Sequence, residues 1–387
     1  MPRGNQFRHQ QYHGEAGNAS FEFLTPTPPP VPGSDEFERR MARVGDIFRR
    51  ANVRAIYLLH GTFVGSDAWG LIRDLARVLP KAATPLFHWH KQLWDSWAGE
   101  AGNFTREYAA EFERTINSDG NDSRRISVRP FHWSSENHHI GRADGAVRLL
   151  DELLAHEEYG GGRVLLWGHS HGGNVLALAS NLLANDRASN RRFFRAARSY
   201  YRWTGSGATD LPVWERVRSA LRATDHVFSR MSLDLVTLGT PVRYGWDTAG
   251  CGRLLHFINH RPVLGQPAHR APFPPAMDDV LTAADGDYVQ QLGIAGTDAV
   301  LPFWSFRARL AERRLKRLLQ PGLLVRDTLA RLRLGVRLHA DGINLLVNYG
   351  PPAGHVGQHC AGHAVYTRLS WLLFHAEEVA RQCYQPF

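Results

Sequence analysis

Apolar residues follow two alternating patterns along the chain, and this alternation predicts an α/β fold. Short continuous apolar runs with the length of buried strands are separated by stretches in which apolar residues recur at helical spacing. The candidate strands are residues 53–59, 126–133, 163–167, 233–238, 254–258, 289–295 and 343–347. Strands that alternate with helices favour a mainly parallel, doubly wound sheet, with a site at the carboxyl ends of its strands.

The helical pattern is clearest in five stretches. Phe37, Met41, Val44 and Phe48 share one helical face, and Asp35 and Glu38 are candidate capping residues at its start. A second helix is expected to begin at Ser66 and to carry Trp69 and Leu79. The remaining predicted helices span residues 106–117, 142–156 and 364–383.

Two kinds of segment fall outside this alternation. Residues 1–33 are expected to form a tail, because five prolines between positions 26 and 32 disfavour a helix or a central strand. Residues 34–387 then form one domain with two arginine-rich helical insertions, at 186–230 and 301–340. The first insertion is a candidate lid, a candidate lipid-facing surface or a pair of solvated helices.

The most informative motif is Gly168-His169-Ser170-His171-Gly172. It follows the apolar run 163–167 and precedes a small-residue apolar run at 175–179, so it has the strand, turn and helix that a nucleophile elbow requires. Glycines on either side leave room for a sharp turn that exposes the serine hydroxyl. We therefore predict that Ser170 is a nucleophile; the alternative is a structural turn.

A second motif follows the strand at 53–59, where the chain continues as His60-Gly61-Thr62. The backbone N–H groups of Thr62 and of His171 are predicted to form an oxyanion hole beside Ser170. An ordinary strand-to-loop glycine is the alternative. The aromatic residues Phe63, Trp89 and Trp94 are candidate walls of a substrate pocket, or members of a packed cluster under a long loop.

These motifs resemble the lipase/esterase branch of the α/β-hydrolases. The matching pieces are His60-Gly61, the elbow continued as Gly173-Asn174, and Leu238-Gly239-Thr240-Pro241. The resemblance covers about residues 53–383 and leaves the tail and both insertions outside it. It implies a serine nucleophile at Ser170 and a reduced fold that lacks the first two strands.

A serine hydroxyl needs a base at neutral pH, and in this family the expected chain order is serine, acid, histidine. His363, at the start of the last predicted helix, is the predicted base. His355, His359 and His375 remain open, although His375 has the position of a helical core residue. The late histidines also raise a metal-site alternative, but no acidic ligand lies among them, and no metal or cofactor is expected.

Asp298 is the predicted acid, because it directly follows the candidate strand 289–295. If the run 254–258 is instead the seventh strand, Asp298 shifts out of register. The carboxylates that remain open are Asp247, Asp278, Asp279 and Asp341.

Composition and charge narrow the class of protein. The chain has 387 residues, 43% hydrophobic and 21% charged, which is ordinary for a globular protein, and a net charge of +9. Its basic residues are nearly all arginine, which reflects either the codon usage of a GC-rich genome or a basic surface for acidic lipids or nucleic acid. Three cysteines are too few for a disulfide scaffold. No membrane span, secretory leader or nucleic-acid motif is recognisable, so cytoplasmic residence is expected.

The expected function is therefore hydrolysis of a carboxylic ester, with a small acyl ester or a lipid as substrate. A serine amidase or peptidase would share every motif named above. A third alternative is a non-catalytic hydrolase fold that binds membranes or partners through its arginine-rich faces. Peripheral contact with an anionic membrane is an expectation, nucleic-acid binding is not, and the sequence gives no oligomeric state.

Overall fold

The computed structural model describes most of the chain, with gaps. The described residues are 7–8, 19–62, 103–118, 124–184, 186–202, 211–223, 227–294, 301, 305–321, 330, 332–335, 337–352, 354 and 356–385.

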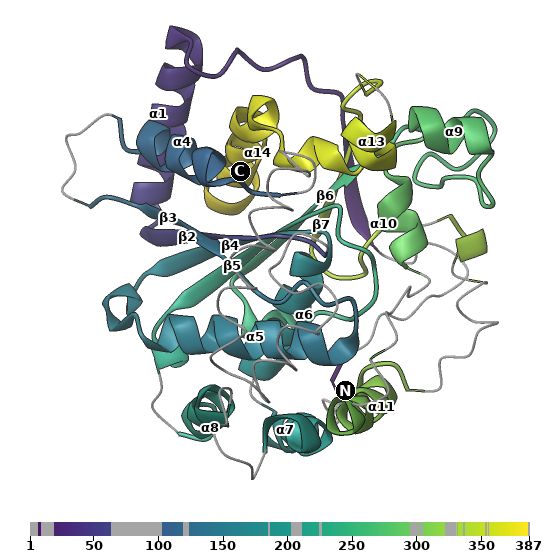
Figure 1. Cartoon of the computed structure of the whole chain (residues 1–387). Coiled ribbons are helices and arrows are strands. Elements are labelled where there is room, and N and C mark those ends of the chain that lie inside the picture. The colour runs from purple at the N-terminus through teal and green to yellow at the C-terminus, as the bar shows by residue number, and fades with distance from the viewer. Residues whose placement is uncertain are drawn as a thin grey trace, which may run out of the picture.

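One sheet of seven parallel strands organises the described residues, in the order β1-β7-β6-β5-β4-β2-β3 (Figure 1). The strands are β1 (Ser20–Leu24), β2 (Val53–Leu59), β3 (Ser127–Phe131), β4 (Arg163–His169), β5 (Ser232–Leu238), β6 (Arg253–Asn259) and β7 (Ile343–Val347). Every pairing between neighbours is parallel, which confirms the predicted α/β class.

Helices cover both faces of this sheet. Their bounds are α1 (Asp35–Arg50), α4 (Arg106–Ile116), α5 (His139–Leu154), α6 (His171–Leu183), α7 (Arg187–Tyr201), α8 (Leu211–Ala220), α9 (Met277–Thr282), α10 (Tyr288–Gly293), α11 (Phe306–Leu319), α13 (Val356–His359) and α14 (Leu372–Val379). Figure 1 shows α1, α4 and α14 on one face, with α5 and α6 on the other.

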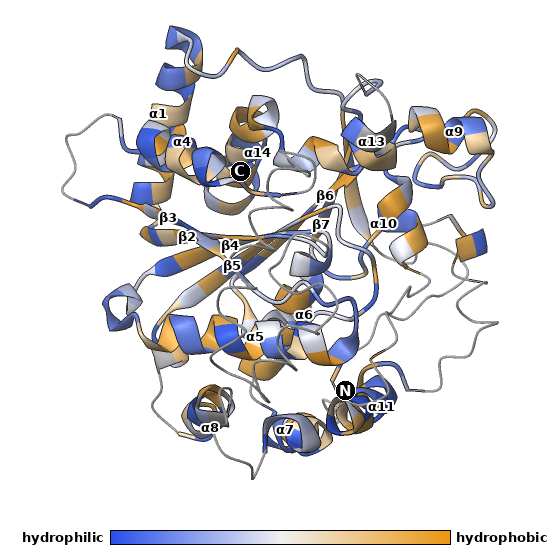
Figure 2. Ribbon diagram, in the orientation of Figure 1, coloured by the Kyte–Doolittle hydropathy of each residue, from blue (hydrophilic) through white to orange (hydrophobic). Residues whose placement is uncertain are grey.

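Side chains alternate between two cores along each central strand. In β4, Val164 and Leu166 pack in the cluster that includes α5 and α6, whereas Leu165 and Trp167 pack in the cluster that includes α1, α4 and α14. Burial on both faces explains why the strand appears in the sequence as a continuous apolar run. Figure 2 shows hydrophobic residues concentrated in the strands and many hydrophilic residues on α7 and α11.

A third layer of helices lies outside α5. Figure 1 shows α7, α8 and α11 on the side of α5 that faces away from the sheet. Phe193 and Trp214 are fully buried in this layer, and the Trp214 indole donates a hydrogen bond of 2.8 Å to Asp144 of α5. The described part of residues 186–230 is thus packed through its aromatic side chains.

The second arginine-rich segment joins the same layer through α11. The Glu312 carboxylate of α11 accepts hydrogen bonds from the backbone N–H groups of His139 and Ile140, at 3.0 and 2.7 Å. These amides open α5 and have no partner within the helix. A carboxylate there stabilises α5 and ties α11 to it.

Three sequence predictions differ from the structure. Residues 20–24 of the predicted tail form β1, an edge strand beside β7; the prolines follow this strand and so do not interrupt it. The predicted strand 289–295 is wrong, because α10 occupies it: Gln290 and Gln291 are buried, whereas Val289 and Leu292 are exposed. The predicted helix 364–383 is broken into 3₁₀ turns, α14 and a π-helical end.

Candidate active site

Ser170 lies at the sharp turn between β4 and α6. Its φ is +51° and its ψ is −128°, a backbone conformation that non-glycine residues rarely adopt and that stores strain. The Ser170 amide donates to the Leu238 carbonyl at 2.9 Å, and the Thr240 hydroxyl donates to the Ser170 carbonyl at 2.9 Å. Two bonds from the end of β5 therefore hold the strained residue in place.

Glycines make this turn sterically allowed. A Cβ atom at Gly172 would lie 2.7 Å from the His60 carbonyl oxygen, and one at Gly173 would overlap the Thr240 side chain. A Cβ atom at Gly168 would lie 2.7 Å from the Gly173 nitrogen. Any side chain at these positions would force α6, the loop after β2 or the loop after β5 to move.

The loop after β2 contacts the serine directly. A Cβ atom at Gly61 would lie 2.8 Å from Ser170 Cβ and 3.4 Å from Ser170 Oγ. The Ser135 hydroxyl donates to the Gly61 carbonyl at 2.9 Å. Because a trans peptide group directs its C=O and N–H to opposite sides, this bond leaves the Thr62 N–H on the side away from Ser135. His171 is the first residue of α6, so its N–H has no intrahelical partner.

A buried histidine–aspartate pair lies beside this turn. His363 Nδ1 donates to Asp287 Oδ2 at 2.7 Å, and both side chains are almost completely buried. When Nδ1–H of a neutral imidazole donates a hydrogen bond to a carboxylate, Nε2 carries no proton and can act as an acceptor. Among the residues that the structure describes, His363 Nε2 has no hydrogen-bond partner.

The His363–Asp287 pair lies, like Ser170, at the carboxyl ends of the strands. The His363 ring centroid lies 4.6 Å from that of His169, the residue that precedes the serine. A Cβ atom at Gly239, just after β5, would lie 2.8 Å from Asp287 Oδ2. The ends of β2, β4 and β5 thus converge with the segments that follow β6 and β7.

Asn259, the last residue of β6, holds both members of the pair. Its side-chain amide donates to the Gly362 carbonyl at 2.8 Å, directly before His363. Its own carbonyl accepts the Asp287 N–H at 3.0 Å. The fully buried Arg337 also donates to that carbonyl, at 3.2 Å, and its positive charge lies close enough to interact with the Asp287 carboxylate.

Asp287 was not among the predicted acids. It caps α10, with Asp287 Oδ1 accepting the Gln290 N–H at 2.8 Å, so the pattern Asp-x-x-Gln at a helix start was the available signal. The run 254–258 does form strand β6, the condition under which Asp298 was expected to shift out of register. Asp298 itself lies outside the described residues.

The other candidate histidines have separate positions. His375 is fully buried, and its Nε2 forms a 2.8 Å hydrogen bond with the Tyr349 hydroxyl. Burial lowers the pKa of His375 to about 3. This confirms that it is a core residue. His359 is buried at the end of α13, and His355 lies outside the described residues.

The other candidate carboxylates are engaged elsewhere. Asp247 caps a 3₁₀ turn at 248–250, and Asp278 and Asp279 open α9. Asp341 precedes β7, and burial raises the pKa of its carboxyl group. The candidate pocket residues Phe63, Trp89 and Trp94, and the predicted helix after Ser66, lie outside the described residues.

The described part of the chain shows neither a metal cluster nor a membrane-spanning helix. There, no group of three or more His, Cys, Asp or Glu side chains is arranged to hold a metal ion. Nor does any helix within it have both the length and the apolar character needed to cross a bilayer. Comparisons of the whole chain with protein-family models, curated proteins and solved structures gave no match.

Proposed function

We propose that the protein is a serine hydrolase with an α/β-hydrolase fold that cleaves carboxylic esters. The observation that carries this proposal is a strained serine at a strand-to-helix turn beside a buried, hydrogen-bonded His363–Asp287 pair. The chain order is serine, acid, histidine, as the resemblance implies. The sheet order supports it too. The serine follows the central strand β4, and the acid and the histidine follow β6 and β7, which lie beyond β5 toward one edge.

In the proposed reaction Ser170 Oγ attacks the ester carbonyl carbon while His363 Nε2 accepts the hydroxyl proton. The C–O bond to the alcohol breaks, and the imidazolium returns the proton to the leaving alkoxide. Water then attacks the acyl-enzyme with the same base, releasing the acid and restoring Ser170. Asp287 holds the imidazole in one tautomer and stabilises its positive charge.

The N–H groups of Thr62 and His171 are the proposed donors to the tetrahedral oxyanion. The contact of Gly61 with the serine side chain and the helix-start position of His171 support this role. One such donor is typically worth about 2.7–4 kcal/mol of transition-state stabilisation. Ester cleavage is preferred over amide cleavage on the resemblance alone, so the test includes both substrate classes.

The test compares wild-type protein with Ser170→Ala on p-nitrophenyl acyl esters and on the matching p-nitroanilides. Ser219→Ala, an exposed serine on α8, is the matched control. We expect ester turnover and fluorophosphonate labelling by the wild type and the control, and neither by Ser170→Ala. Equal ester turnover by Ser170→Ala, or no labelling of the wild type, contradicts the proposal; faster anilide cleavage would instead identify an amidase.

A further inference from the structure

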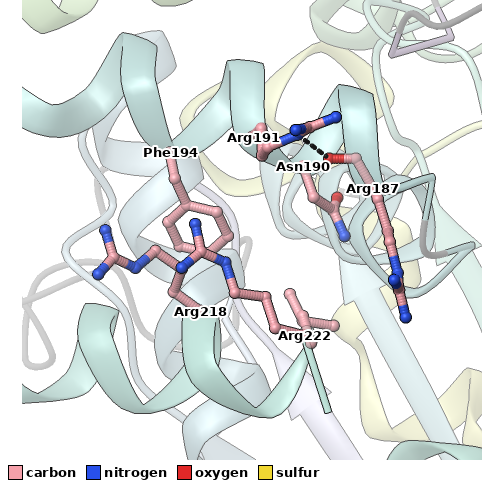
Figure 3. A pocket seen from close by; sticks show the side chains of 7 residues that line it. Arg187, Asn190, Arg191, Phe194, Arg218 and Arg222 are labelled. Carbon is pink, nitrogen blue, oxygen red and sulfur yellow. Dashed lines mark hydrogen bonds between the residues drawn. The ribbon is translucent and has the colours of Figure 1, made fainter. Parts of the chain in front are cut away.

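An arginine-lined pocket lies in the third layer, between α7 and the end of α8 (Figure 3). It has a volume of about 420 Å³, within the size range of small-molecule sites. Its lining residues are Arg187, Asn190, Arg191, Phe194, Arg218, Leu221 and Arg222. Four of these seven side chains are guanidinium groups, so the pocket concentrates positive charge.

Few carboxylates balance this charge. Glu215 forms an ion pair with Arg218 at 2.5 Å and also pairs with Arg202. Arg187, Arg191 and Arg222 have no acidic partner among the residues that the structure describes. By contrast, Arg216 on the same helix α8 makes two hydrogen bonds to Asp151, at 2.8 and 2.7 Å. The pocket therefore brings together three arginines that lack an acidic partner, whereas Arg216 nearby has one.

The floor of the pocket is apolar. Phe194 is 4% exposed and Leu221 is 2% exposed, and both pack into the main core cluster. Arg218 Nε is buried without a hydrogen-bond partner in the described part of the chain. Guanidinium groups against an apolar, low-dielectric wall attract an anion more strongly than they would in open water. Like-charge repulsion between them is relieved when an anion binds.

We propose that this pocket binds a phosphate group. In this proposal its oxygens accept paired N–H hydrogen bonds from the guanidinium groups of Arg187, Arg191 and Arg222. Arg218, which is paired with Glu215, adds positive charge. Guanidinium forks match the geometry of phosphate oxygens, which makes arginine better suited to this task than lysine. Free phosphate and the headgroup of an anionic lipid present the same chemistry. The site is separate from Ser170 and does not depend on the proposed hydrolysis.

The test measures binding of inorganic phosphate by calorimetry, and of phosphatidylcholine vesicles with and without phosphatidic acid by flotation. The pocket variant is Arg187→Gln with Arg222→Gln. The matched control is Arg195→Gln with Arg198→Gln, which removes the same charge from exposed positions of α7 outside the pocket. All four side chains are exposed, so each variant should keep the wild-type thermal midpoint.

We expect the pocket variant to bind phosphate at least about tenfold more weakly than the wild type, and the control to bind within about twofold. Arg187→Lys with Arg222→Lys should fall between them, since it keeps the charge and loses the fork. Binding to phosphatidic acid vesicles alone, with the same dependence on the pocket variant, would support the site and identify a lipid headgroup as the source.

Two results would overturn the proposal. In one, the control weakens binding as much as the pocket variant does, which assigns the effect to diffuse positive charge. In the other, the wild type binds neither inorganic phosphate nor the phosphatidic acid vesicles.

Discussion

At the scale of single residues, the strained backbone of Ser170 lowers the stability of the fold at the position of the proposed nucleophile. A residue held at φ +51° and ψ −128° costs on the order of 1–3 kcal/mol when it carries a Cβ atom. The strain persists because bonds to Leu238 and Thr240 fix the turn from both sides. Stability is thus reduced at the position where the proposed mechanism needs a hydroxyl held on a sharp turn, although Ser170 is only 5% exposed.

Replacing this serine with alanine or with glycine should therefore give two inactive proteins of different stability. Both variants lack the hydroxyl, but only glycine relieves the strain, so Ser170→Gly should unfold with a free energy about 1–3 kcal/mol above that of Ser170→Ala. Urea denaturation of the two variants measures the difference. Equal unfolding free energies would mean that the turn is not strained.

Asp287 allows a second residue-scale prediction. Asp287→Asn keeps the shape of the side chain but removes the charge that stabilises the imidazolium, so kcat for ester hydrolysis should fall by about 10⁴-fold. Steady-state kinetics with Asp279→Asn as the control, a carboxylate at the start of α9, tests it. If Asp279→Asn proved as damaging, or Asp287→Asn kept near-normal kcat, the acid would be a different residue.

At the scale of elements, the end of β6 positions the proposed acid and base together. Asn259 donates to the Gly362 carbonyl and accepts the Asp287 N–H, so one strand end fixes two loops that are far apart in sequence. The neighbouring strand has a comparable buried asparagine, Asn344, which instead donates to the Ser20 carbonyl of β1. Asn259 therefore supports the candidate site, whereas Asn344 supports the pairing of strands in the sheet.

Asn259→Ala should lower kcat by about 10- to 100-fold, because small displacements of reacting groups carry penalties of that size. KM should change little, since Asn259 is not proposed to touch substrate. Asn344→Ala should lower the unfolding free energy while leaving kcat per folded molecule unchanged. Parallel kinetics and denaturation of both variants check this, and a normal kcat for Asn259→Ala would remove its positioning role.

The sequence predicts elements best where local pattern and tertiary burial agree. The strands at 53–59 and 343–347 match β2 and β7 at both ends, because each is a mostly apolar segment buried on both faces. The strand predicted at 289–295 fails because Gln290 and Gln291, not the apolar residues, face inward in α10. The apolar pattern is misleading there because buried glutamines bond to the Thr240 and Pro272 carbonyls.

For the candidate site, local sequence motifs were sufficient to predict the serine and the loop after β2, but not the acid. Ser170 and Gly61 lie in motifs whose geometry is set by adjacent residues, and the structure brings them into contact. Asp287 reaches His363 through a long segment after β6 that Asn259 and Arg337 anchor, and these are contacts between distant parts of the chain. No short window of sequence contains that information.

At the scale of the whole molecule, buried neutral histidines link stability to pH. Burial lowers the pKa of His260, His339 and His375 to about 3 in each case. The unfolded chain, with a histidine pKa near 6.5, binds protons that the folded protein excludes between about pH 6.5 and pH 3. Folding stability should therefore decrease as the pH falls through that window.

The unfolding free energy measured in urea at several pH values tests this expectation. Each such histidine contributes up to about 1.4 kcal/mol per pH unit to the slope. His375→Gln keeps a hydrogen-bonding side chain beside Tyr349 without a titrating group, so its slope should be shallower than that of the wild type. An identical slope for the variant would show that His375 does not contribute.

The pairing of β1 with β7 affects how the sheet folds. In the described sheet the only strand that pairs with β1 is β7, which lies 323 positions later in the chain, since Ser20 pairs with Ile343. Contacts of such long sequence separation form late and slowly. β1 therefore stays unpaired until β7 is in place, and during this interval its short length and the prolines that follow it limit pairing with strands of other molecules.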